Sequence, residues 1–150
     1  MTAFNFDTSR IEWTHIVDTD VDYPCDYELA ILNEDPDAGR LDLIVKWPPN
    51  SYCHFHRHIG DTAILVIEGE QHITEINDDG SEGAVKVRPA GTYAFSKGGE
   101  AHMEKGGPEG AVIFFAMTAV DGKFFESLDR DMNVLSASTV EDSSKTLAPS

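Results

Sequence analysis

Apolar and polar residues alternate along much of this chain, in short runs separated by clusters of Asp, Asn, Gly and Pro. A period of two is typical of strands with one buried face, and no long run shows the period of an amphipathic helix. The runs predict strands at Arg10–Val17, Asp26–Asn33, Arg40–Trp47, Ser51–His58, Thr62–Glu68, Glu70–Asn77, Ala84–Arg88, Thr92–Ser96 and Ala111–Thr118. Many short strands at this spacing predict an all-β sandwich or barrel.

The C-terminal part of the chain is less regular. Residues Asp121–Arg130 fit either a late strand or a short helix. From Ser136 onward the sequence is polar and rich in Ser and Thr, which predicts a frayed end. We therefore expect one folded domain at residues 1–135, followed by a polar tail at residues 136–150.

Composition and charge narrow the range of partners. The chain has 41% hydrophobic and 25% charged residues, as soluble globular proteins do. Its net charge is −16 with only 11 Lys and Arg residues, which argues against nucleic acid or anionic lipid as a partner. No apolar run is long enough to cross a membrane, and the first residues do not resemble a signal peptide. We expect a cytoplasmic protein with no membrane association.

The first chemical signal is a pair of histidines at the start of a predicted strand. His56 and His58 stand two positions apart, so a strand places both imidazoles on one face, where they can bind one ion. The run from His56 to Gly69 resembles the first motif of the cupin superfamily, His-x-His-x3-Glu-x6-Gly. Thr62 occupies the place of the motif glutamate, so this run lacks an anionic ligand.

A second run resembles the second cupin motif, Gly-x5-Pro-x-Gly-x2-His-x3-Asn. Gly91, Gly99 and His102 stand at the motif spacings, while Lys97 replaces the proline and Gly106 replaces the asparagine. The two motifs occur in the cupin order, and together they cover residues 56–106. The resemblance implies a single-domain cupin, that is, a double-stranded β-helix or jelly-roll barrel.

The resemblance also implies a metal site inside the barrel. His56, His58 and His102 would be its ligands, and the alternative is a set of buried, hydrogen-bonded histidines without a metal. Imidazole suits several transition metals; we expect Fe(II), with Zn(II) or Ni(II) as alternatives.

Four further residues stand near the expected ligands. His54 alternates onto the same face and could be a ligand instead of His58, or lie at the mouth of the barrel beside the ligands. Glu100 and Glu104 flank His102 at two positions either side and could approach the ion if that segment is extended. Thr62 could hydrogen-bond a metal-bound water.

Three neutral ligands would leave a divalent ion with its full charge, which favours an anionic, chelating substrate such as the enolate of a β-diketone. The chain is therefore similar to the small three-histidine cupins related to acetylacetone-cleaving dioxygenases. That resemblance implies a non-haem Fe(II) enzyme that uses O₂ to cleave a carbon–carbon bond of a β-diketone or related ketone. The apolar residues proposed for its substrate pocket are Phe95, Phe115, Met117 and Ile64.

Two other functions are compatible with the motifs. One is a regulatory or sensor cupin that holds zinc without catalysis, because the first motif also resembles the cupin half of zinc-holding anti-sigma factors. The other is a cupin isomerase or small-ligand binder. By analogy with other cupins we expect a homodimer.

Overall fold

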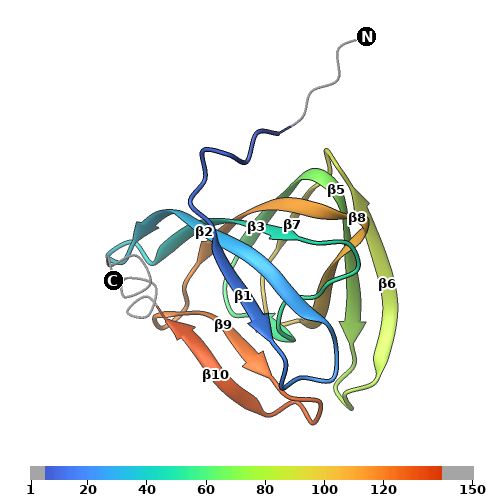
Figure 1. Cartoon of the computed structure of the whole chain (residues 1–150). Coiled ribbons are helices and arrows are strands. Elements are labelled where there is room, and N and C mark those ends of the chain that lie inside the picture. Colours follow the sequence, from blue (N-terminus) through green and yellow to red (C-terminus); the bar gives the residue numbers. More distant parts are fainter. Residues whose placement is uncertain (1–5, 140–150) are drawn as a thin grey trace.

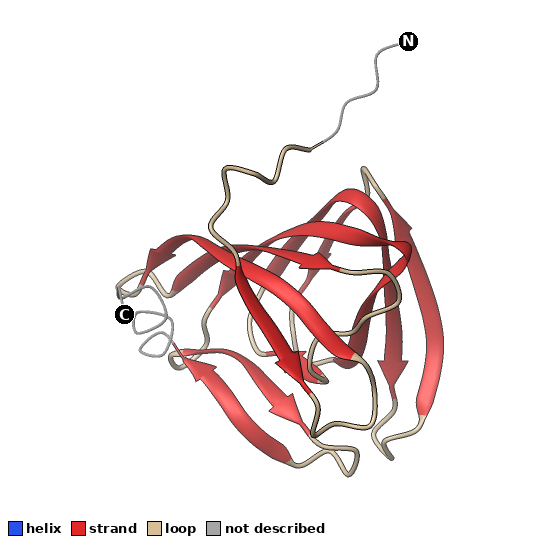
Figure 2. Cartoon of the chain, in the orientation of Figure 1, coloured by secondary structure: helices blue, strands red, loops and turns tan. Residues whose placement is uncertain are grey.

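The chain folds into ten β-strands, as the computed structural model shows for residues 6–139, the range that the structure describes (Figures 1 and 2). The strands are β1 Thr14–Asp18, β2 Cys25–Asp35, β3 Arg40–Trp47, β4 His56–His58, β5 Thr62–Ile76, β6 Glu82–Pro89, β7 Tyr93–Ser96, β8 Ala101–Thr118, β9 Lys123–Leu128 and β10 Val134–Thr139. The predicted all-β fold is confirmed. Within the described range we find no helix with the length and apolar character needed to cross a membrane.

The longest strand, β8, connects the two parts of the sheet. Along one path the strand order is β1-β2-β3-β8-β4-β9-β10, and β5 pairs with β8, β6 and β7. β8 pairs with β5 over most of its length, with β3 along its second half, and with β4 at its beginning. All these pairs are antiparallel, and the sheet curls into a half-barrel (Figure 1).

Two predicted strands are one strand in the structure. The runs Thr62–Glu68 and Glu70–Asn77 join as β5, because Gly69 does not turn the chain back. Gly69 instead has a φ of +70° and lies between register shifts of the β5–β8 ladder, so it forms an irregularity within a continuous strand.

The later strands also differ from the sequence prediction. β8 starts at Ala101 instead of Ala111, since the glycines near residue 106 lie within the strand. The ambiguous run after Asp121 contains a strand, β9. The domain boundary expected after residue 135 falls inside β10, which pairs with β9, so residues 136–139 are part of the sheet. The rest of the expected tail, residues 140–150, lies outside the described residues.

The core fills the concave side of the sheet. Its main cluster comes from β3, β5 and β8, with one face of β8 buried almost completely: Ile113 is 0% and Phe115 2% exposed. Removing each such side chain from water stabilises the folded state by about 1.5–3 kcal/mol. This packing fixes the face of β8 that carries the functional residues described below.

Two motif glycines with positive φ, Gly69 within β5 and Gly91 in a turn, have different requirements, which substitution should separate. Both Gly69 and Gly91 have positive φ, but a Cβ on Gly69 would lie 2.1 Å from the backbone oxygen of Gly110, whereas a Cβ on Gly91 meets no atom within 4 Å. We expect Gly91→Ala to lower the free energy of unfolding by about 1–2 kcal/mol, the cost of the left-handed conformation. Gly69→Ala should cost clearly more, because the β5 and β8 backbones must also separate. Urea unfolding of both variants measures this, and equal losses would contradict the argument.

Candidate metal centre

Four potential metal ligands meet on the concave side of the sheet. His56 and His58 come from β4, and His102 and Glu104 from β8. Each pair is two positions apart and therefore shares one face of its strand. The β4–β8 register sets His56 opposite His102, and this brings the pairs together. One ligand atom from each residue lies within 4.8 Å of the others.

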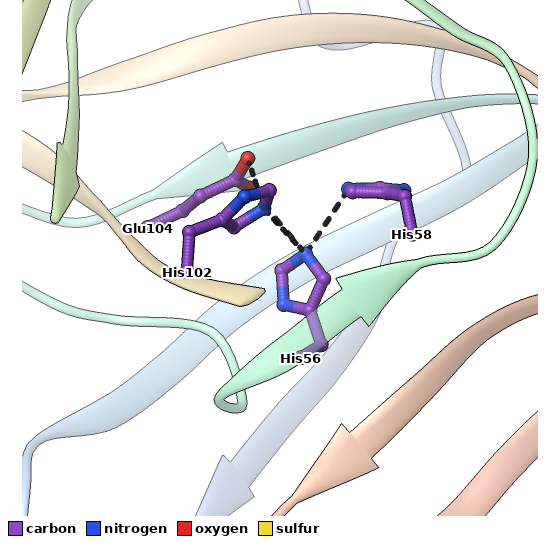
Figure 3. Close-up of side chains that lie close together, drawn as sticks. All are labelled: His56, His58, His102 and Glu104. Atoms are coloured by element: carbon purple, nitrogen blue, oxygen red, sulfur yellow. Dashed lines mark hydrogen bonds and ion pairs between the residues drawn. The ribbon is translucent and has the colours of Figure 1, made fainter. Parts of the chain in front are cut away.

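The spacing of the four groups fits a shared ion (Figure 3). The Nε2 atom of His56 lies 3.1 Å from Nε2 of His58 and 3.2 Å from Nε2 of His102. The carboxylate of Glu104 places Oε1 3.1 Å from Nε2 of His102 and Oε2 3.9 Å from Nε2 of His56. Ligand atoms about 2.1 Å from one ion lie about 3.0–3.4 Å apart, close to most of these separations.

Burial keeps two of the imidazoles uncharged. It lowers the pKa of His56 to about 4 and that of His58 to about 3, with neighbouring histidines adding to the effect. Both rings are therefore neutral at neutral pH, which is the state that binds metal.

Contacts behind the histidines fix which nitrogen faces the cluster. Nδ1 of His56 donates to the carbonyl oxygen of His54, at 2.7 Å. Nδ1 of His58 lies 3.5 Å from the hydroxyl of Thr62, which is also 3.4 Å from the carbonyl of Gly60. A proton on Nδ1 leaves the Nε2 lone pair free, so the facing nitrogens repel one another unless a cation lies between them. Thr62 thus contacts the far side of His58 and not the space between the ligands.

Glu104 supplies the carboxylate that the first motif lacks. Its side chain is 1% exposed. Burial alone would raise its pKa, but the adjacent His102 and the other histidines outweigh burial and lower it to about 2. Gln71, which is fully buried, donates from Nε2 to Oε1 of Glu104 at 3.2 Å, and Arg88 donates to Oε1 of Gln71 at 3.3 Å.

The three histidines of the expected ligand set are therefore accompanied by a carboxylate that could be a fourth ligand. The sequence signal for Glu104 was its position two residues after His102. Because this segment is a strand, residues two positions apart share one face, and Glu104 therefore lies on the same face as His102. Nothing in the sequence singled out Gln71, because it is not one of the fixed positions of either motif and no sequence pattern marks a glutamine as buried.

Two of the other candidates lie outside the cluster. His54 points away from it: its Nε2 lies 2.8 Å from Oδ2 of Asp18 and its Nδ1 3.1 Å from the hydroxyl of Tyr27. The structure brings His58, and not His54, to the other ligands. Glu100 is exposed and borders a small pocket of about 50 Å³ on the other side of His102.

A large open cavity of about 510 Å³ adjoins the cluster. His56, His58 and Glu104 form part of its wall, and most of the rest is aliphatic or aromatic. Phe115 and Met117 line it, as the sequence predicted.

The other two predicted pocket residues lie elsewhere. Ile64 belongs to the core and borders only the small pocket. Phe95 lines neither of these two pockets and is 54% exposed, so the structure does not bring it to the cavity where Phe115 and Met117 lie.

Several solved structures are similar in fold to this chain. Among solved structures, an acetylacetone dioxygenase from Acinetobacter johnsonii has a TM-score of 0.68 and 14% identity, over 97% of this chain and 96% of that one. A protein from Methylibium petroleiphilum PM1, whose acetylacetone dioxygenase assignment is itself a proposal, has a TM-score of 0.73 and 14% identity, over 99% and 96%. An RmlC-like cupin from Ralstonia eutropha JMP134 has a TM-score of 0.70 and 15% identity, over 97% and 85%.

These identities are low enough that the likeness establishes the cupin fold alone. No curated protein matches the chain at significant similarity. The sequence model of the ChrR cupin-like domain matches residues 2–121, which is most of the chain. The chain therefore belongs to the ChrR cupin-like domain family of the cupin superfamily.

Proposed function

We propose that this protein is an Fe(II)-dependent dioxygenase that cleaves a carbon–carbon bond of a β-diketone or related ketone. The observation that carries the proposal is a buried cluster of three histidines and one carboxylate that opens onto a large apolar cavity. Histidine and carboxylate ligands with remaining open positions are typical of non-haem iron oxygenases. A bound Fe(II) would supply the redox chemistry with O₂.

The protein side chains would select and hold the substrate. His56, His58, His102 and Glu104 would hold the ion, which would bind the oxygens of a diketone enolate at the positions that these residues leave open. With Glu104 as a ligand the divalent ion keeps one net positive charge, which still attracts the enolate anion. The apolar wall, including Phe115 and Met117, keeps water away from the bound substrate.

A zinc-holding regulatory cupin is the second candidate. Four protein ligands also match the tetrahedral preference of Zn(II), and structural zinc sites are closed by such a set. The cavity favours the enzyme, because a structural zinc site has no need of a large apolar space beside it.

Metal content and O₂ uptake together test the proposal. Protein loaded anaerobically with Fe(II) should hold about one ion per chain and consume O₂ when a β-diketone is added. His102→Ala should weaken metal binding more than about a hundredfold and abolish uptake, while His15→Ala, which removes an exposed histidine outside the cluster, should change neither. Tight zinc without O₂ uptake by any diketone would favour the regulatory candidate.

The contacts of Glu104 predict a role for Gln71 in metal affinity. Gln71→Leu removes the amide that donates to Glu104, so the carboxylate loses an orienting contact. We expect an affinity loss of about 10- to 100-fold, and a larger one for Glu104→Gln, measured by competition with a chelator. His72 lies on the same strand, and its side chain pairs with Glu70 in the part of the chain that the structure describes, so His72→Ala should leave the affinity unchanged. An unaltered affinity in Glu104→Gln would remove the carboxylate from the ligand set.

The buried histidines also predict acid sensitivity of the metal-free protein. The pKa values of His56 and His58 lie below the 6.5 of exposed histidine, so the unfolded chain binds more protons as the pH falls from about 6.5 towards 4. The free energy of unfolding should therefore fall across this range and stay level above it. His58→Asn should reduce the slope of the free energy of unfolding against pH by up to about 1.4 kcal/mol per pH unit. Urea unfolding at pH 7, 6 and 5 gives the free energy of unfolding of the wild type and of the variant. A wild-type value that does not change with pH would contradict the effect of burial on the two histidines.

A further inference from the structure

The cavity beside the metal cluster is larger than a minimal β-diketone needs. It measures about 510 Å³. At about 30 Å³ per heavy atom, the value for liquid water, the roughly seven heavy atoms of acetylacetone would fill less than half of it. The surplus volume is bounded by apolar side chains such as Leu29, Leu43 and Val45, which would pack against a hydrophobic substituent.

The wall of this cavity carries almost no positive charge to hold an acidic substrate. Among the described residues that line it, none is Lys or Arg, while Asp18 and Glu104 are both acidic. Removing an unpaired anion from water into such a space is costly. The part of the substrate that lies beyond the metal is therefore uncharged.

Two sets of polar residues interrupt the apolar wall away from the four ligands: the serines Ser127, Ser136 and Ser138, and one hydrogen-bonded chain. Tyr27, His54 and Asp18 all line the cavity and form a hydrogen-bonded chain, with Nε2 of His54 2.8 Å from Asp18 and Nδ1 of His54 3.1 Å from the Tyr27 hydroxyl. The backbone N–H of Asp20 and the side chain of His54 both lower the pKa of the Asp18 carboxyl, which is therefore an acceptor.

This chain fixes the direction of each hydrogen bond. His54 donates from Nε2 to the carboxylate of Asp18, so its Nδ1 carries the lone pair. The Tyr27 hydroxyl then donates to Nδ1. Burial raises the pKa of Tyr27, so the phenol stays protonated. Its oxygen is left with acceptor capacity only, and a ligand group that satisfies it must be a donor.

We propose that the substrate is an uncharged, hydrophobic β-dicarbonyl compound larger than acetylacetone, with a hydroxyl or N–H group remote from its chelating oxygens that donates to Tyr27. This inference rests on the function proposed above and specifies its substrate. Tyr27 is a specificity-determining residue in this account, held in orientation by His54 and Asp18.

Anaerobic binding to the Zn(II)-loaded protein tests the substrate class without turnover. The probes are acetylacetone, 1-phenyl-1,3-butanedione and its 4-hydroxyphenyl and 4-carboxyphenyl derivatives, followed by calorimetry and by the absorbance of the chelated enolate. We expect the phenyl compound to bind more tightly than acetylacetone, the hydroxyphenyl compound about five- to tenfold more tightly again, and the carboxyphenyl compound more weakly than the phenyl one.

Tyr27→Phe should abolish the advantage of the hydroxyphenyl compound and leave the affinity of the phenyl compound within about twofold. Tyr93→Phe, which removes a hydroxyl from an exposed tyrosine outside the cavity, should preserve the advantage. Equal affinities for the phenyl and hydroxyphenyl compounds, or acetylacetone as the tightest ligand, would overturn the inference while leaving the proposed function standing. If no diketone binds, the inference about the substrate fails, and O₂ uptake by the Fe(II) protein decides the proposed function separately.

Discussion

The site depends on one constraint, the register between β4 and β8. Because side chains alternate along a strand, His56 opposite His102 puts both histidine-bearing faces on the concave side, and a slip of one residue would turn a pair outward. β4 is only three residues long and cannot hold this register alone. The long β5–β8 ladder and the packing of Ile113 and Phe115 do so instead, so the accuracy of the site comes from distant core contacts.

The same register determines the electrostatics of the centre. It buries Glu104 among imidazoles that burial keeps neutral, with Gln71 and Arg88 behind it. A buried carboxylate facing nitrogen lone pairs is costly without a cation. A bound divalent ion would neutralise the carboxylate and accept the lone pairs together, so metal binding would add to the stability of the fold.

The sequence predicted the fold class, most strands and the three histidines that meet, because each leaves a periodic signal: alternation for strands and fixed spacings for the histidines. It did not predict what depends on the third dimension. The predicted strand before Thr118 began only at Ala111, so β8 was too short and Glu104 was left as an option. The polar run of β10 resembled a tail because none of its residues is buried. Phe95 was proposed for the pocket because it is apolar, and an apolar residue on a strand can also lie on the exposed face.

The ligands on β4 and β8 are separated by 46 positions, with three strands between them. Closing so long a segment costs chain entropy before any ligand contact is made. During synthesis, β4 therefore leaves the ribosome with two histidines and no partner, and only the later arrival of β8 completes the set. Metal uptake would then report on completed folding, and a truncated or misfolded chain would compete poorly for a scarce metal ion.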